Sequence, residues 1–280
     1  MNFQDITFVI VMYKSEKVIH ECLKELPEDL RKIVVDNSGN EKLKKNIEEK
    51  YNNLECFLMN ENLGYGRANN FGINEAKTDY AFIINPDTKI NEEKCKKIVS
   101  YLNGQDFAIA APQIIESDKI YKQNKSDKKF IEVEQVPGMA MIINKKKFNK
   151  NYFDENIFMY LEETDLCKRM KDLGERILEI NIGVYHLGGQ SHGDYDFEIE
   201  KSRNWHWMWS KFYFNKKHYN YFYSFFKTLP NLFSSCFKTL LFLLIRNKVK
   251  STQYKMRLSG LVNSYLLKKS FYRPHKKKSF

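Results

Sequence analysis

The sequence predicts an α/β fold with a Rossmann-like, mostly parallel central sheet flanked by helices, followed by a helical extension. Apolar runs of strand length alternate with segments of helical periodicity in units of about 25–30 residues. Residues 6–12 are apolar almost throughout, which is typical of a strand buried on both faces of a parallel sheet. A change to basic and aromatic composition near residue 204 predicts the extension.

Strands and helices can be placed in order along the chain. Short apolar runs predict strands, and apolar residues three or four apart predict helices. Ser15 is expected to cap the first helix, and Gly174 to end the last helix before the extension. In the first half, strands are expected at 6–12, 32–35, 54–59 and 80–84, and helices at 18–26, 43–51 and 68–76. In the second half, strands are expected at 107–111, 136–143, 176–180 and 183–187, helices at 91–102 and 162–173, and an exposed hairpin or loop at 116–130.

Several classes of protein are disfavoured by absent motifs. No GxGxxG follows the first apolar run, which argues against a nicotinamide or flavin dehydrogenase, and no GxxxxGK[ST] is present, which argues against a P-loop enzyme. The five cysteines are scattered without metal-site spacing, so we expect reduced thiols in a cytosolic protein. The sequence begins with no basic segment followed by an apolar one, so we expect no secretory signal.

The charge is distributed unevenly. Of the net +11, residues 201–280 contribute 18 Lys and Arg and no Asp or Glu, whereas the other 200 residues carry 28 basic against 35 acidic side chains. This asymmetry predicts two parts with different neighbours, which we divide as a catalytic domain at 1–218 and a basic extension at 219–280.

The extension is predicted to lie on a membrane surface. Its apolar runs at 219–226 and 229–245 are interleaved with Lys227 and Lys238, a pattern that favours interfacial helices on an anionic bilayer over a full crossing. Lys276, Lys277 and Lys278 fit the same interpretation. The alternative is a helical pair packed on the catalytic domain or on a second subunit of a homodimer. Nucleic-acid binding is disfavoured because no RNA- or DNA-binding motif is visible.

One carboxylate is placed for metal chemistry. The strand predicted at 80–84 leads directly into Asn85-Pro86-Asp87, and ligands of open α/β sheets lie beyond the carboxyl ends of the strands. A carboxylate there can hold a divalent cation against a phosphate. The alternative is an ordinary turn with a solvated Asp87.

Further polar residues follow strands or open helices in the same way. They are Asp36, the acidic group Glu162, Glu163 and Asp165, and His186. Each has a structural alternative: a turn residue, a favourable helix start, or a histidine satisfied in the core.

In order and spacing these residues resemble the family 2 glycosyltransferases of the GT-A fold, in particular their rhamnosyltransferase-like branch. The resemblance runs from about Phe8 to His218. Its specific segments are 60–66 with Asn69 and Asn70, 85–88, 153–155 with 158–169, and His186 with Gly188-Gly189-Gln190-Ser191.

The resemblance implies roles for these residues. Asp87 and His186 would hold Mg²⁺ or Mn²⁺ on the donor diphosphate, and Glu163 would be the general base, with Glu162 or Asp165 as alternatives. Asp36 would accept the imide N–H of a uracil or thymine ring. The remaining donor-binding positions are Tyr13, Asn62, Gly64, Arg67, Asn70, Asn85 and Gly138.

Three segments depart from the family pattern. The family often has Thr-Tyr-Asn after the first strand, where this chain has Met12-Tyr13-Lys14. The metal motif is reduced to Asn85-Pro86-Asp87, and Glu163 stands where the family has Asp. The extra methylene shifts the carboxylate by about 1 Å, a displacement that can change a rate.

The expected function is an inverting transfer of a sugar, rhamnose or another deoxyhexose, from a dTDP- or UDP-sugar to a lipid-linked or cell-surface glycan. The expected location is the cytoplasmic face of the cell membrane. Two alternatives remain open, a non-catalytic membrane-associated scaffold and a nucleotidyltransferase on a similar sheet.

Overall fold

The computed structural model describes residues 1–116, 119–120, 128–188 and 196–274. The chain divides into two compact units: a sheet unit of Met1–Asp154 and Glu163–Asp194, and a helical unit of Glu155–Glu162 and Tyr195–Phe280. The functional boundary expected at residue 218 stays a prediction, because compactness does not show where a catalytic domain ends.

The first half of the sheet unit is parallel, as predicted. Its strands are β1 (Ile6–Met12), β2 (Arg31–Asp36), β3 (Leu54–Leu58) and β4 (Tyr80–Ile84). They lie in the order β3-β2-β1-β4, and each neighbouring pair is parallel. The carboxyl ends of all four strands therefore share one edge, where the predicted site residues follow them.

The second half makes the sheet mixed. β9 (Ala140–Asn144) runs antiparallel between β4 and β6 (Ile109–Glu116). β10 (Ile177–His186) is parallel to β6, and β5 (Thr88–Lys89) is antiparallel to the end of β10. Two short strands, β7 (Lys119–Ile120) and β8 (Phe130–Glu132), pair with β6 and β10. The α/β class is confirmed, although strand direction in this half differs from a mostly parallel sheet.

β10 joins two strands that the sequence predicts separately. Its register against β6 shifts between Ile180 and Gly183, and a Cβ at Gly183 would lie 2.4 Å from Ile115 Cδ1. Glycine is needed because the neighbouring strand fills the space of a side chain, as at many β-bulges.

Helices cover both faces of the sheet. They are α1 (Glu16–Glu25), α2 (Glu41–Lys50), α3 (Tyr65–Glu75), α4 (Glu92–Leu102) and α5 (Glu162–Asp172), with 3₁₀ turns at Phe3–Asp5 and Lys145–Lys147. Phe8 and Ile10 of β1 pack with α1, α2 and α4, whereas Val9 packs with α3 and α5. The continuous apolar run thus reflects two buried faces. Ser15 precedes α1 but makes no side-chain capping bond, contrary to expectation.

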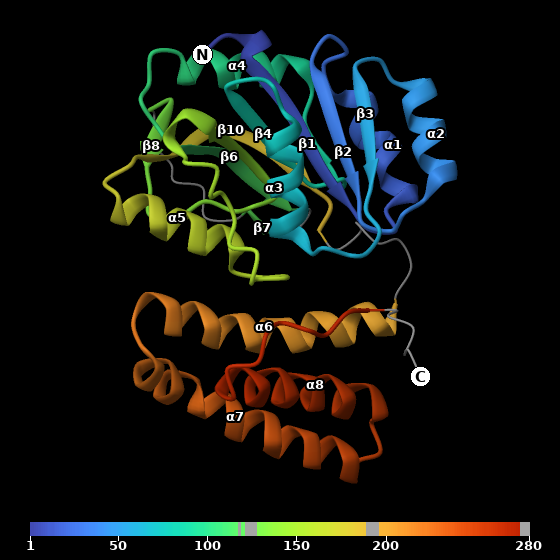
Figure 1. Ribbon diagram of the computed structural model, residues 1–280, viewed down its shortest axis with the longest axis vertical. Coiled ribbons are helices and arrows are strands. Elements are labelled where there is room, and N and C mark those ends of the chain that lie inside the picture. Colours follow the sequence, from blue (N-terminus) through green and yellow to red (C-terminus); the bar gives the residue numbers. More distant parts are fainter. Residues whose placement is uncertain (117–118, 121–127, 189–195, 275–280) are drawn as a thin grey trace. The chain divides into compact units, whose positions relative to one another are not determined.

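The helical unit contains α6 (Phe197–His218), α7 (Tyr221–Leu244) and α8 (Lys248–Tyr265), coloured orange to red in Figure 1. α6 and α8 approach closely, since a Cβ at Gly260 would lie 2.1 Å from the Trp205 carbonyl oxygen. No described helix is both long enough and apolar enough to cross a bilayer.

The segment 155–162 packs within the helical unit. The Phe158 and His206 rings lie 4.5 Å apart, and Ser210 Oγ donates to the Met159 carbonyl at 2.8 Å. Burial lowers the pKa of His206 to about 3, so this histidine is neutral at physiological pH. The backbone leading into α5 is therefore held by α6.

Candidate active site

Asp87 and His186 meet at the edge formed by the strand ends. The turn after β4 leads into β5, whose Thr88 lies opposite His186 in the antiparallel pair with β10. This register brings Asp87 Oδ1 to 3.3 Å from His186 Nε2. Both side chains are buried, Asp87 at 2% exposure and His186 at 8%.

The oxygen atoms around Asp87 fit a divalent cation. Both Asp87 carboxylate oxygens and Asn85 Oδ1 are buried without a hydrogen-bond partner among the described residues. A buried carboxylate without hydrogen bonds is costly unless a positive partner compensates. Carboxylate and amide oxygens with one imidazole nitrogen are suitable ligands for Mg²⁺ or Mn²⁺.

The protein supplies few ligands at this position. Within the described ranges, no group of three or more His, Cys, Asp or Glu side chains could hold a metal. Magnesium is commonly bound by one or two carboxylates together with substrate phosphates. The donor set of Asp87, Asn85 and His186 therefore fits a cation that a diphosphate would also ligate.

Glu116 is a neighbour of His186 that the sequence analysis missed. The parallel register of β6 and β10 pairs Glu116 with His186, and Glu116 Oε1 lies 3.0 Å from His186 Nδ1. Burial alone lowers the pKa of His186, but the adjacent carboxylates of Asp87 and Glu116 outweigh it and raise that pKa overall. A carboxylate on the second ring nitrogen also fixes the ring's orientation. The available signal was its place at a strand's carboxyl end, where a Lys-rich stretch begins.

Glu163 lies at the start of α5 beside Gly138. A Cβ at Gly138 would lie 3.4 Å from Glu163 Cβ, and Tyr65 Oη donates to the Gly138 carbonyl at 2.6 Å. Although Glu163 is partly exposed by surface area, the protein around it is dense, and this burial raises the pKa of its carboxyl. A raised pKa suits a carboxylate that must accept a proton.

The other two acids of the predicted group differ from Glu163. Asp165 is fully buried and accepts from Arg169 Nε at 2.8 Å, and Arg169 also donates to the Tyr152 carbonyl. This ion pair ties α5 to the preceding loop. Glu162 is buried and belongs to the helical unit.

Asp36 builds the turn after β2. Its Oδ1 accepts from the Ser38 backbone N–H at 2.8 Å and the Ser38 hydroxyl at 2.5 Å, and its Oδ2 accepts from the Asn40 N–H at 2.8 Å. The side chain is fully buried. These contacts are those of a turn residue, which was the alternative to a binding role for Asp36. Its recognition of a uracil or thymine ring stays a prediction. Tyr13 is partly exposed after β1, with Lys14 Nζ 5.7 Å from its ring centroid.

The predicted donor loop is ordered by amide side chains. Asn62 Oδ1 accepts from the Gly64 N–H at 3.0 Å, and Gly64 has φ +84° at the start of α3. Asn70 is a backbone clamp: its Nδ2 donates to the Phe153 carbonyl, and its Oδ1 accepts from the Phe153 N–H, both at 2.8 Å. Arg67 is exposed on α3.

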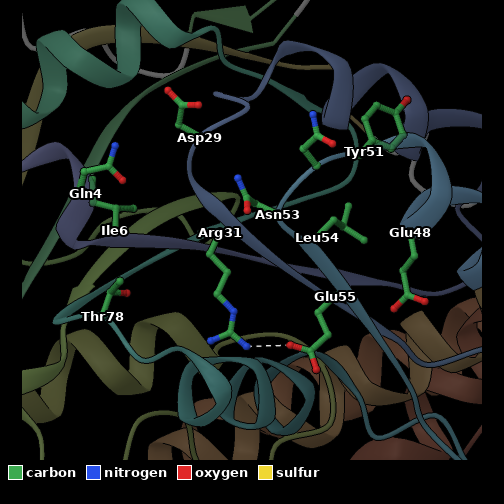
Figure 2. A pocket seen from close by; sticks show the side chains of 11 residues that line it. Gln4, Ile6, Asp29, Arg31, Glu48, Tyr51, Asn53, Leu54, Glu55 and Thr78 are labelled. Atoms are coloured by element: carbon green, nitrogen blue, oxygen red, sulfur yellow. Dashed lines mark hydrogen bonds and ion pairs between the residues drawn. The ribbon is translucent and has the colours of Figure 1, made fainter.

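A cavity of about 570 Å³ lies elsewhere in the sheet unit (Figure 2). Its lining includes Ile6, Arg31 and Leu54, the first residues of β1, β2 and β3. Arg31 is paired with Glu55 at 2.7 Å. The cavity therefore lies at the amino ends of the strands and contains none of the predicted site residues.

Parts of the predicted pattern lie outside the described residues. These are Gly189, Gln190 and Ser191 after His186, and Lys276 to Lys278 at the end of the chain. The five cysteines are free thiols, as expected.

The chain is similar in sequence to known proteins. The chain is 26% identical over 204 residues to the low-salt glycan biosynthesis hexosyltransferase Agl10 of Haloferax volcanii, covering 64% of each chain. It is 26% identical over 187 residues to the dTDP-rhamnosyl transferase RfbF of Shigella flexneri, covering 59% of this chain and 63% of RfbF. The matches thus span a little under two thirds of both relatives.

A solved structure and a family model complete the comparison. The mannosyltransferase PcManGT of Pyrobaculum calidifontis, in complex with GDP-Man and Mn²⁺, superposes with a TM-score of 0.57 at 13% identity, covering 93% of this chain and 86% of that one. At this identity the likeness concerns the fold alone. The family model described as glycosyl transferase family 2 matches residues 7–169. Because that match covers more than half of the sequence, the chain belongs to glycosyl transferase family 2.

Proposed function

We propose that the chain is an inverting, nucleotide-sugar-dependent glycosyltransferase. It transfers rhamnose or another deoxyhexose from a dTDP- or UDP-sugar to a hydroxyl of a lipid-linked or cell-surface glycan. The observation that carries the proposal is the buried carboxylate of Asp87 beside His186, with no hydrogen-bond partner among the described residues. The similarity to Agl10, a hexosyltransferase, and to RfbF, a dTDP-rhamnosyl transferase, supports sugar transfer, and RfbF supports rhamnose.

The side chains divide the chemistry between them. Glu163 takes the proton of the acceptor hydroxyl as the bond to the sugar forms, and its raised pKa matches that role. Asp87 and His186 would hold a divalent cation, which when bound neutralises charge on the leaving diphosphate. Glu116 keeps the His186 ring in place. A single displacement at the sugar carbon requires no enzyme nucleophile.

The structure favours Glu163 over the other two acids as the base. Asp165 accepts a hydrogen bond from Arg169 Nε, so its carboxylate is already engaged in an ion pair. Glu162 is the last residue of the segment 155–162, which belongs to the helical unit. Glu163 combines a raised pKa with partial exposure, which an acceptor hydroxyl needs.

A panel of sugar nucleotides tests the proposal. We expect the purified full-length chain to release nucleoside diphosphate from dTDP-rhamnose faster than from UDP- or GDP-hexoses, with Mg²⁺ or Mn²⁺ required and EDTA inhibitory. A non-catalytic scaffold would bind donors without turnover. A nucleotidyltransferase would instead release pyrophosphate from a nucleoside triphosphate and a sugar phosphate. Either outcome would contradict the proposal.

The proposal includes attachment to an anionic membrane through α7. Large apolar side chains on one side of this helix are exposed, namely Phe222, Phe226, Phe233, Phe237, Leu240 and Leu244. Their spacing of three, four or seven residues places them along one helical face. Together with the acid-free sequence of residues 201–280, this face suits insertion among anionic lipid headgroups.

Polar substitution of this face should release the protein from membranes. We expect the combined variant Phe226→Ser, Phe233→Ser and Phe237→Ser to bind phosphatidylglycerol vesicles at least about tenfold more weakly, because each exposed aromatic ring contributes apolar area on insertion. Flotation with vesicles measures binding, and circular dichroism checks the fold. Leu173→Ser, at another exposed apolar residue, is the control and should float like the parent. Equal flotation of the triple variant would assign the face to a protein contact.

A further inference from the structure

A second cavity, of about 290 Å³, lies within the helical unit. It is lined by Tyr160, Glu200, Arg203, Asn204, Trp207 and Arg257. Four of these residues come from α6, one from α8 and one from the segment before α5. Ligand sites in proteins occupy about 300–1,000 Å³, so this cavity is at the small end and suits only a small ligand, such as a single sugar ring with one attached group.

Two arginines give this cavity a net positive charge. Arg203 donates from Nε to Tyr160 Oη and from Nη1 to Glu200 Oε1, both at 3.0 Å. Arg257 donates from Nε to Asn204 Oδ1 at 2.7 Å. Among the described residues, these bonds leave the terminal nitrogens of Arg257 and the Nη2 of Arg203 for a ligand. Arg257, held through Nε, thus presents both terminal nitrogens as a fork that matches phosphate or carboxylate, and Arg203 adds one further donor.

Trp207 supplies an apolar wall. Its side chain is 40% exposed, whereas Trp205 and Trp209 are buried. The Trp207 and Tyr160 rings pack edge to face, with centroids 5.3 Å apart and an interplanar angle of 88°. This contact with Tyr160 restricts the orientation of the indole. An aromatic face beside fixed polar groups is the usual composition of a ligand site, and the C–H face of a pyranose ring can lie on an indole.

The backbone at this cavity is strained. Tyr160 and Leu161 have φ values of +71° and +68°, and neither is glycine, although this region disfavours side chains. Tyr160 is also only three residues before Glu163. Because consecutive Cα atoms are about 3.8 Å apart, these two Cα atoms lie within about 11 Å for any arrangement of the two units.

We propose that this cavity binds an anionic sugar group of the acceptor, with its phosphate or carboxylate on Arg257 and Arg203 and its ring on Trp207. The inference rests on the proposed glycosyltransferase function, for which it names a feature of the acceptor. A negative group on a sugar is the chemistry that two arginines and an exposed indole recognise together. The short chain from Tyr160 to Glu163 links acceptor binding to the carboxylate that accepts its proton.

The indole N–H resonance of Trp207 tests the proposal in the full-length protein. The three tryptophans give three signals, and Trp207→Phe identifies the relevant one. The probes are glucose 1-phosphate, glucuronic acid, glucose and inorganic phosphate, which separate ring from charge. We expect at least one anionic sugar to shift the Trp207 signal with about tenfold or greater preference over glucose and over phosphate. A preference for glucose 1-phosphate identifies a sugar phosphate, and a preference for glucuronic acid identifies an acidic sugar.

Matched variants of α8 complete the experiment. Arg257→Gln should weaken the anionic sugar about tenfold or more, because it removes a charged donor from the cavity. Lys255→Gln removes the same charge from an exposed position on this helix and should bind like the parent. Equal shifts with glucose, no shift with either anionic sugar, or unaltered binding by Arg257→Gln would overturn the inference. Hydrolysis of the donor by Arg257→Gln is read separately, so a failed acceptor site and a failed glycosyltransferase assignment give different results.

Discussion

Replacing Asp87 by alanine is expected to lower sugar transfer by about 10²–10⁴-fold, because a metal clamp on the leaving group contributes several kcal/mol to the transition state. The carboxylate is buried beside His186, and neither of its oxygens has a hydrogen-bond partner among the described residues. Its removal breaks the 3.3 Å ion pair with His186, which keeps its contact with Glu116. Transfer is measured with a fixed donor and acceptor, and Mn²⁺ binding is measured by calorimetry.

Asp79 provides the matched control for this experiment. It precedes β4, whereas Asp87 follows it, and it is paired at the surface with Lys146 at 2.6 Å. Asp79→Ala should leave transfer and Mn²⁺ binding unchanged. Full activity in Asp87→Ala, or Mn²⁺ binding equal to that of the parent, would remove Asp87 from the proposed site.

Glu163→Gln should lower transfer by about 10²–10⁴-fold, the usual contribution of a general base. The amide has the same shape but cannot accept the acceptor's proton. Burial raises the pKa of Glu163, and the base must be ionised to act. The parent's rate should therefore fall as the pH falls through this raised pKa, at a higher pH than for an ordinary glutamate. Transfer rates across a pH series measure both effects, and this acidic limb should disappear in the variant's residual rate.

Asp165→Asn distinguishes a base from a structural acid. The same carboxylate-to-amide change breaks the Asp165–Arg169 ion pair at a fully buried position. We expect a lower melting temperature, with turnover per folded molecule much closer to the parent than in Glu163→Gln. If Asp165→Asn instead abolished turnover and Glu163→Gln kept it, the roles of the two acids would be reversed.

The parallel half of the sheet could be predicted because its strands are buried on both faces. Phe8 and Val9 enter different core clusters, so the composition of β1 alone reveals its environment. Strand direction has no such signal, which is why the antiparallel β9 was not expected. β10 was predicted as two strands, 176–180 and 183–187, although it continues through a bulge between Ile180 and Gly183.

The contacts of single site residues could likewise be predicted only in part. Asp87 and His186 could be paired from sequence because their motifs resemble a known family. Glu116 could not, since its contact with His186 depends on the register of two strands 70 residues apart. Asn70 was predicted to bind the donor, yet both of its hydrogen bonds described here go to the Phe153 backbone. The type of a side chain and its position in the sequence do not reveal which backbone groups it will hydrogen-bond.

The Asn70 clamp has a mechanical consequence. The Asn70 carboxamide pairs with the backbone N–H and carbonyl of Phe153, as a neighbouring strand would. These two hydrogen bonds fasten the first turns of α3 to the chain at Phe153. We therefore expect α3 and the backbone at Phe153 to move as one body, so that a displacement of either is passed directly to the other.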